Sequence, residues 1–147
     1  MNLAHNALIV VADGRKMLFF RNEGDAEYPN LVVEYGEENP NPADRDQKTD
    51  AQGQRPSSAT PGQESTSETD YHKQAEDLFA AHAAEELKVR ALRNDFEELI
   101  IVAAPKVLGE MRKHYHKEVS SRLKGEVAKD LTGHPPDQIE TILKDHS

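Results

Sequence analysis

Two aspartates next to expected strands are the first residues of this chain that suggest chemistry. Asp13 follows an apolar run and precedes Gly14, and Asp130 follows Lys129 near the last strand-like segment. Paired carboxylates at the edge of a sheet can hold Mg²⁺ for phosphoryl transfer. Asp13-Gly14 is also an ordinary turn pair, and Lys129 offers Asp130 an ion-pair partner. A structural role is the first interpretation, and metal chemistry is an alternative.

His82 and Glu86 form a second candidate pair, one turn apart in a segment that is rich in Ala, Leu and Glu. A step of about 100° per residue places both near the centre of an apolar stripe. Such a pair could bind a metal or relay a proton. A hydrogen-bonded pair at a core edge or in a dimer interface explains it as well, which leaves a homo-oligomer open. The stripe consists of Tyr71, Ala75, Leu78, Phe79 and Val89.

None of the seven His residues shows a metal-ligand spacing, so we expect neither a metal site nor a cofactor. Basic residues are concentrated between positions 105 and 129, with seven bases against three acids. We expect a weak anion-binding face near the start and flank of a helix, where N-terminal N–H groups add positive potential. A solvated helix face is the alternative. The expected anion-binding residues are Lys106, Arg112, Lys113 and Lys117.

Apolar segments predict the strands that position these residues. The runs at 6–12, 16–21 and 31–35 predict an antiparallel meander, with Asp13-Gly14 in the first turn. The runs at 99–103 and 125–131 predict two more strands.

Helical spacing predicts a long helix from Asp70 to about Arg93, a second from Lys106 to about Arg122, and a third that starts at Pro135-Pro136. Strands separated by helices pair in parallel through right-handed crossovers. The sequence therefore predicts an α/β fold with a mixed five-stranded sheet of order 3-2-1-4-5 and covering helices.

In such a sheet, ligands bind in the crevice at the carboxyl ends of the strands. This crevice is our expected pocket, and residues that follow the first, fourth and fifth strands would line it. They are Asp13, Gly14, Pro105, Lys106, Lys129, Asp130 and Thr132.

Residues 36–70 lack Val, Ile, Leu, Phe and Met, so burial cannot offset the entropy of ordering them. We expect a disordered acidic loop there. Residues 23–70 hold 12 acids and three bases, which accounts for the net charge of −9. That charge argues against general nucleic-acid binding. The chain lacks Cys, a membrane-length apolar run and a recognisable signal peptide, so we expect a cytoplasmic protein without a membrane partner.

Three motifs in order resemble the bacterial host attachment family, also called proteins required for attachment to host cells. They are Ala12-Asp13-Gly14, LIIVAAPKVLGEMR at 99–112 and VAKDLT at 127–132. The resemblance runs nearly end to end, although Pro105-Lys106 replaces a more usual Pro-Pro. It implies a single host-attachment-type domain over residues 1–147, with the loop at about 36–70 as an insert.

That family is in turn similar to the middle domain of archaeal and eukaryotic peptide-chain release factors, which has a ribonuclease H-like topology. In release factors, the loop before the long helix bears a Gly-Gly-Gln tripeptide that helps water attack peptidyl-tRNA. Here Gly53-Gln54 and Gly62-Gln63 each lack the first glycine. The resemblance therefore implies the fold more directly than it implies hydrolysis.

We expect a non-enzymatic interaction protein of the host attachment family, with an unknown protein partner and a regulatory part in attachment. A first alternative is a release-factor-like translation or ribosome-rescue factor, in which Gln54 or Gln63 positions water and basic residues contact RNA. A second alternative is a divalent-metal phosphoesterase that uses Asp13 and Asp130.

Overall fold

The protein folds as one five-stranded sheet with helices on both faces. The computed structural model describes residues 1–38 and 61–146, and of residues 61–72 the backbone alone. The strand order β3-β2-β1-β4-β5 confirms the α/β class and the order expected from sequence. The strands are β1 (Leu8–Ala12), β2 (Lys16–Asn22), β3 (Leu31–Glu38), β4 (Leu99–Ala103) and β5 (Leu123–Val127). The helices are α2 (Pro61–Leu92), α3 (Pro105–Arg112), α4 (Lys117–Ser120) and α5 (Pro136–Asp145).

The central strand β1 determines which strand ends meet. It pairs antiparallel with β2 and parallel with β4, so that Ala12 lies opposite Ala103. Strand β5 continues the parallel part beside β4. The carboxyl ends of β1, β4 and β5 therefore lie at one edge of the sheet, and the residues that follow them are neighbours there.

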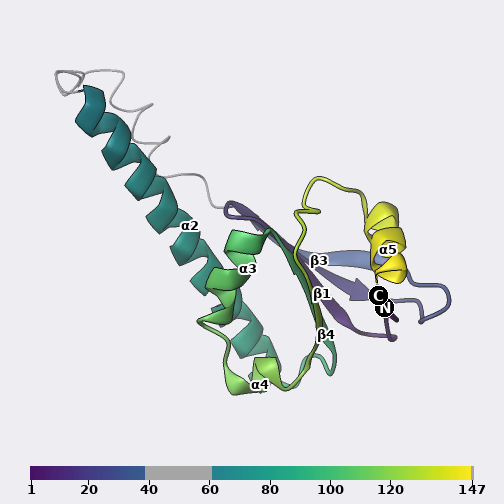
Figure 1. Ribbon diagram of the computed structural model, residues 1–147. Helices are drawn as coiled ribbons and strands as arrows, with labels where there is room; N and C mark the ends of the chain where they lie inside the picture. The colour runs from purple at the N-terminus through teal and green to yellow at the C-terminus, as the bar shows by residue number, and fades with distance from the viewer. Residues whose placement is uncertain (39–60, 147) are drawn as a thin grey trace.

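Two hydrophobic layers hold the helices against the sheet. Helices α2, α3 and α4 cover one face, and α5 covers the other (Figure 1). The alternation of β1 supplies both layers, since Leu8 and Val10 pack towards α2 while Ile9 and Val11 pack towards α5. All five residues of β1 and of β4 are buried, which explains why both strands are continuous apolar runs in the sequence.

Helix α2 begins at Pro61 rather than near Asp70, so the predicted loop was too long at this end. Proline suits the first helical turn, where its missing N–H is not needed. The Gly, Ser and Thr residues that follow have low helix propensity, and they made the segment resemble a loop. Strand β3 also extends to Glu38, beyond the expected loop start. The rest of the expected loop, residues 39–60, lies outside the described residues.

Of the expected stripe on α2, Ala75 and Phe79 are buried, but the rest of the buried face differs from it. Ala83 and Leu87 lie fully in the core, whereas Leu78 is 71% exposed and Val89 is 40% exposed. Small residues let a helix approach a sheet closely, and the periodicity of the larger side chains does not register them. Five alanines form most of this face: Ala75, Ala80, Ala83, Ala84 and Ala91.

Two further elements differ from prediction, and a third agrees with it. The single helix expected over 106–122 is split into α3 and α4, because His116 caps a new helix by accepting the Glu118 N–H at 3.0 Å. Strand β5 begins at Leu123 and ends at Val127, earlier than expected. Helix α5 begins at Pro136, as the proline pair indicated. None of the helices in the described ranges has the length and hydropathy of a membrane span.

Candidate functional site

The carboxyl edge of the sheet brings three of the expected crevice residues together. Thr132 Oγ1 lies 3.0 Å from Asp13 Oδ2 and 2.7 Å from Asp130 Oδ1. A hydroxyl has a single hydrogen to donate, so two carboxylates compete for it. The contact joins the β1–β2 turn to the loop that follows β5, across this edge of the sheet.

Both carboxylates also stabilise their own loops. Asp13 Oδ1 accepts the backbone N–H groups of Arg15 and Lys16, each at 2.7 Å, which shapes the β1–β2 turn. Asp130 Oδ1 accepts the Thr132 N–H at 3.1 Å. Within residues 1–38 and 61–146, no group of three or more His, Asp or Glu side chains is arranged to hold a metal ion. Asp13 and Asp130, the two carboxylates of the phosphoesterase hypothesis, thus each accept hydrogen bonds from donors of the protein.

Gly14 is also placed at this edge, and its neighbour was not predicted. A Cβ at Gly14 would lie 2.7 Å from Cγ of Glu76, so a larger residue at position 14 would have to displace the Glu76 side chain. Glu76 comes from α2 and adds a third carboxylate near the turn. The sequence does not predict this contact, because it depends on which face of α2 packs against the sheet.

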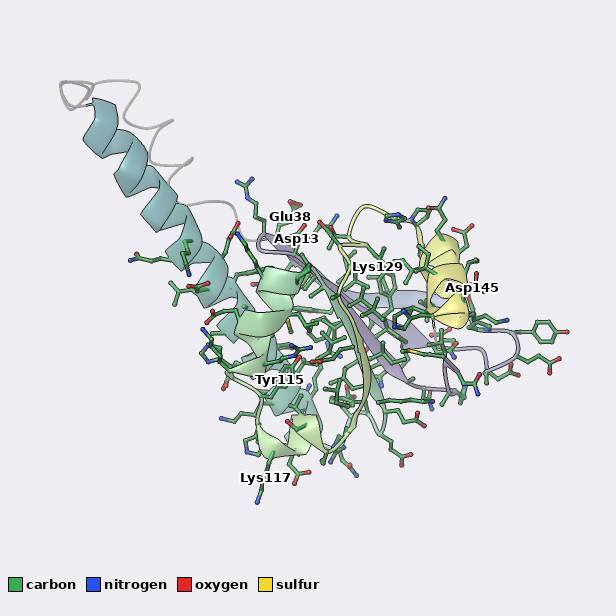
Figure 2. The ribbon with its side chains drawn as sticks, in the orientation of Figure 1. Asp13, Glu38, Tyr115, Lys117, Lys129 and Asp145 are labelled. Atoms are coloured by element: carbon green, nitrogen blue, oxygen red, sulfur yellow. The ribbon has the colours of Figure 1, made fainter. Side chains whose placement is uncertain are left out.

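The remaining crevice residues are exposed around this edge. Pro105 and Lys106 open α3 after β4, and Lys129 follows β5. Figure 2 shows Asp13 at the tip of the β1–β2 turn and Lys129 on the strand-to-helix connection after β5. The carboxyl edge thus presents acidic groups from the β1–β2 turn and α2 beside Lys106, which follows β4, and Lys129, which follows β5.

The start of α3 has the features of an anion site. Its N-cap residue Ala104 makes no side-chain hydrogen bond, and no acid lies in its first turn. The N-cap side chain therefore leaves the N–H groups that follow Pro105 uncapped, and the exposed Lys106 lies at this end. Such an end attracts phosphate or carboxylate groups.

The other three expected anion-binding residues differ in availability. Arg112 Nη2 lies 2.7 Å from Glu126 Oε1, and hydrogen bonding to that carboxylate raises the pKa of Arg112. Lys113 pairs with Glu110 at 3.1 Å. Lys117 projects from α4 away from the sheet (Figure 2). Lys106 and Lys117 form no ion pair with another described residue, so they are the two freest bases of the face.

Tyr115 fixes the connection between α3 and α4 against the sheet. Its hydroxyl donates to Glu126 Oε2 at 3.0 Å, while Arg112 binds the other oxygen of the same carboxylate. Burial and the nearby Glu126 charge raise the pKa of Tyr115. The phenol therefore stays a hydrogen-bond donor, and Glu126 links β5 to the layer that carries the bases.

A second polar cluster, which the sequence does not predict, lies between α2 and β3. Glu34 Oε1 lies 2.8 Å from Arg21 Nη2 and 2.8 Å from Arg90 Nη1. Asp95 Oδ2 accepts from Arg21 at 2.9 Å. Burial alone would lower the pKa of Arg21, but Glu34 and Asp95 raise it overall. The five N–H donors of Arg21 are engaged within the protein, so this cluster is a structural clamp.

His82 and Glu86 belong to the same region but do not pair with each other. His82 Nε2 lies 2.9 Å from Glu37 Oε2 on β3, and Glu86 Oε1 lies 3.5 Å from Arg90 Nε. Glu37 also accepts a hydrogen bond from the Tyr35 hydroxyl. That hydrogen bond lowers the pKa of Glu37 and raises the pKa of Tyr35 to about 12. The His82–Glu37 pair joins α2 to the end of β3.

An open hollow of about 510 Å³ lies at the opposite edge of the sheet, beside the amino ends of β1 and β4. The expected crevice was at the carboxyl edge, so this hollow was not predicted. Asn6 and Asn94 line it, and both have left-handed backbones, with φ of 68° and 60°. The φ of Asn94 reflects the end of α2, where its N–H bonds to Ala91 O at 2.9 Å.

The two glutamines of the release-factor hypothesis cannot be located as side chains. Gln54 lies outside the described residues, and Gln63 lies in the first turn of α2, where only the backbone is described. Helix α2 starts at the end that is farthest from the sheet (Figure 1).

Comparison with known proteins gives one result that covers nearly the whole chain. A family model described as bacterial archaeo-eukaryotic release factor family 12 matches residues 6–143. The matched range begins before β1 and ends within α5, so it includes the five strands, α2, α3, α4 and most of α5. The release-factor part of the expected resemblance is thereby supported, and the match says nothing of host attachment. No curated protein matches the chain.

Proposed function

The chain belongs to bacterial archaeo-eukaryotic release factor family 12, and on this premise we propose that it is a ribosome-binding protein of the translation apparatus. The match over residues 6–143 is the observation that carries the proposal. The partner would be RNA of the ribosome or of a bound tRNA, contacted through phosphates. The protein would act by binding and not by hydrolysis.

The exposed bases of α3 and α4 are the proposed contact. Lys106 lies at an uncapped helix start without a first-turn acid, and Lys117 projects from α4. Lysines beside free backbone N–H groups suit phosphate oxygens. Arg112 and Lys113 would complete this anion-binding face by exchanging Glu126 and Glu110 for phosphate. The acid excess of the chain comes from residues 23–70, whereas residues 105–129 hold seven bases and three acids.

Hydrolysis of peptidyl-tRNA is not part of the proposal. Gly53-Gln54 follows Gln52, and Gly62-Gln63 follows Pro61, so neither pair has the backbone freedom of a double glycine. A host attachment role also stays a prediction, with no observation on this chain in its favour. The phosphoesterase alternative would require a cation between Asp13 and Asp130.

Sedimentation of the full chain with bacterial ribosomes tests the proposal. We expect the protein to travel with ribosomal particles at low salt and to be released as salt rises, because phosphate contacts displace counterions. A chain that remains at the top of the gradient at low salt would exclude ribosome binding. Binding without salt dependence would exclude the phosphate contacts.

A further inference from the structure

The outer face of α2 carries apolar side chains that no described residue covers. Leu78 is 71% exposed, Val89 is 40% exposed and Leu92 is 57% exposed. At about 100° per residue these three lie within about 60° of one another, on the side of α2 opposite its buried alanines. Single exposed apolar residues are common, whereas these three share one stripe of one helix.

The stripe has a symmetric arrangement along the helix. Glu85 lies at its middle, with Leu78 seven residues before it, and with Val89 four and Leu92 seven residues after it. When two such helices lie antiparallel, with a two-fold axis near Glu85, each Leu78 lies level with Leu92 of the second copy and about one turn from its Val89. A two-fold interface needs this self-complementarity, because the same patch must serve both sides.

The charges at the middle of the stripe are also self-complementary. Glu85 and Lys88 lie on this face, 3.7 Å apart, and their side chains are 60% and 39% exposed. Two copies in antiparallel orientation place two acids and two bases near the axis, where each Lys88 can reach a Glu85 of either chain. The chain has a net charge of −9, so a locally neutral stripe is a place where two copies can meet without strong repulsion.

We propose that α2 forms an antiparallel homodimer through Leu78, Glu85, Lys88, Val89 and Leu92. The occupant of the outer face is a second copy of this chain. The interface is one helix stripe wide, so the dimer is reversible and its population depends on protein concentration. The proposal is independent of ribosome binding, which uses α3 and α4.

Sedimentation velocity over a range of concentrations tests the oligomeric state of the full chain. The wild-type protein should show a reversible monomer–dimer equilibrium. Leu78→Glu buries a charge at the interface and should raise the dissociation constant about tenfold or more. Val33→Glu is the matched control, since Val33 is 51% exposed but lies on β3, and it should leave the equilibrium unchanged. A wild-type chain that stays monomeric, or a dimer that tolerates Leu78→Glu, would overturn the proposal.

Cysteine cross-linking tests the orientation, and the absence of native cysteine makes each introduced thiol unique. With a short bismaleimide, Glu85→Cys should cross-link because the two thiols lie near the axis. Leu78→Cys should not, because an antiparallel pair separates the two sites by about 21 Å along the helix. Efficient cross-linking of both variants would indicate parallel helices and contradict the proposed arrangement.

Discussion

The guanidinium carbon of Arg90 lies 4.9 Å from the centre of the Phe19 ring, so a cation from α2 packs on an aromatic residue of β2. The Arg90 side chain is only 11% exposed, and its Nη1 binds Glu34 of β3 at 2.8 Å. One residue therefore joins a helix to two strands. Replacing Arg90 therefore tests whether these contacts hold α2 on the sheet.

Arg90→Ala should lower the free energy of unfolding by about 3 kcal/mol, because it leaves a partly buried Glu34 with one cation fewer and removes the ring contact. Chemical denaturation measures the change. Lys73→Ala is the control, since the Lys73–Asp77 pair at 3.4 Å is exposed and should contribute less than about 1 kcal/mol. Equal effects from the two variants would contradict a structural role for the cluster.

Tyr35 should titrate at unusually high pH in the folded protein. Its hydrogen bond to Glu37 raises its pKa from 10.0 to about 12, and phenolate absorbance follows the titration. A raised folded-state pKa gives stability that is present below pH 10 and is lost as pH rises towards 12. Glu37→Gln should return the pKa of Tyr35 towards 10.0, and an unchanged titration would show that the hydrogen bond is not its cause.

Glu37 should contribute to stability with the opposite pH dependence. Its hydrogen bond with Tyr35 lowers its pKa below the ordinary 4.5. A lowered folded-state pKa gives stability that is present above pH 4.5 and is lost as pH falls. Unfolding curves of wild type and Glu37→Gln should therefore differ most at neutral pH and converge in acid. Curves that stay equally far apart in acid would contradict this.

Asp13→Ala should destabilise the protein by about 1 kcal/mol, because two backbone N–H groups of the β1–β2 turn lose their acceptor. Asp13→Asn keeps an acceptor oxygen and should be close to neutral.

Mg²⁺ should leave the thermal midpoint of the wild-type protein unchanged. A midpoint that rises with Mg²⁺ in wild type but not in Asp13→Asn would support the phosphoesterase alternative.

Most of the fold could be predicted because the strands are visible as short apolar runs in the sequence. The five-residue apolar runs of β1 and β4 are buried on both faces, so their composition alone identifies central strands. The proximity of Asp13 to Asp130 and Thr132 followed from strand order, because parallel carboxyl ends meet at one edge.

Contacts that depend on how α2 packs could not be predicted in the same way. Its buried face consists mainly of alanines, so the stripe was correct at Ala75 and Phe79 and wrong at the large residues Leu78 and Val89. The side that faces the sheet decides that Glu76 lies over Gly14 and that Arg90 reaches Glu34. These partners are far apart in the chain, and no local spacing connects them.

The ribosome affinity of a charge-reversed α3–α4 face tests the central claim most directly. We predict that Lys106→Glu with Lys117→Glu weakens binding of the full chain and reduces the slope of log affinity against log salt by about 2, one for each lost phosphate contact. Lys144→Glu, a single charge reversal on α5 across the sheet, should retain the wild-type affinity and slope. Wild-type affinity in the double variant, or equal loss in Lys144→Glu, would contradict binding through this face.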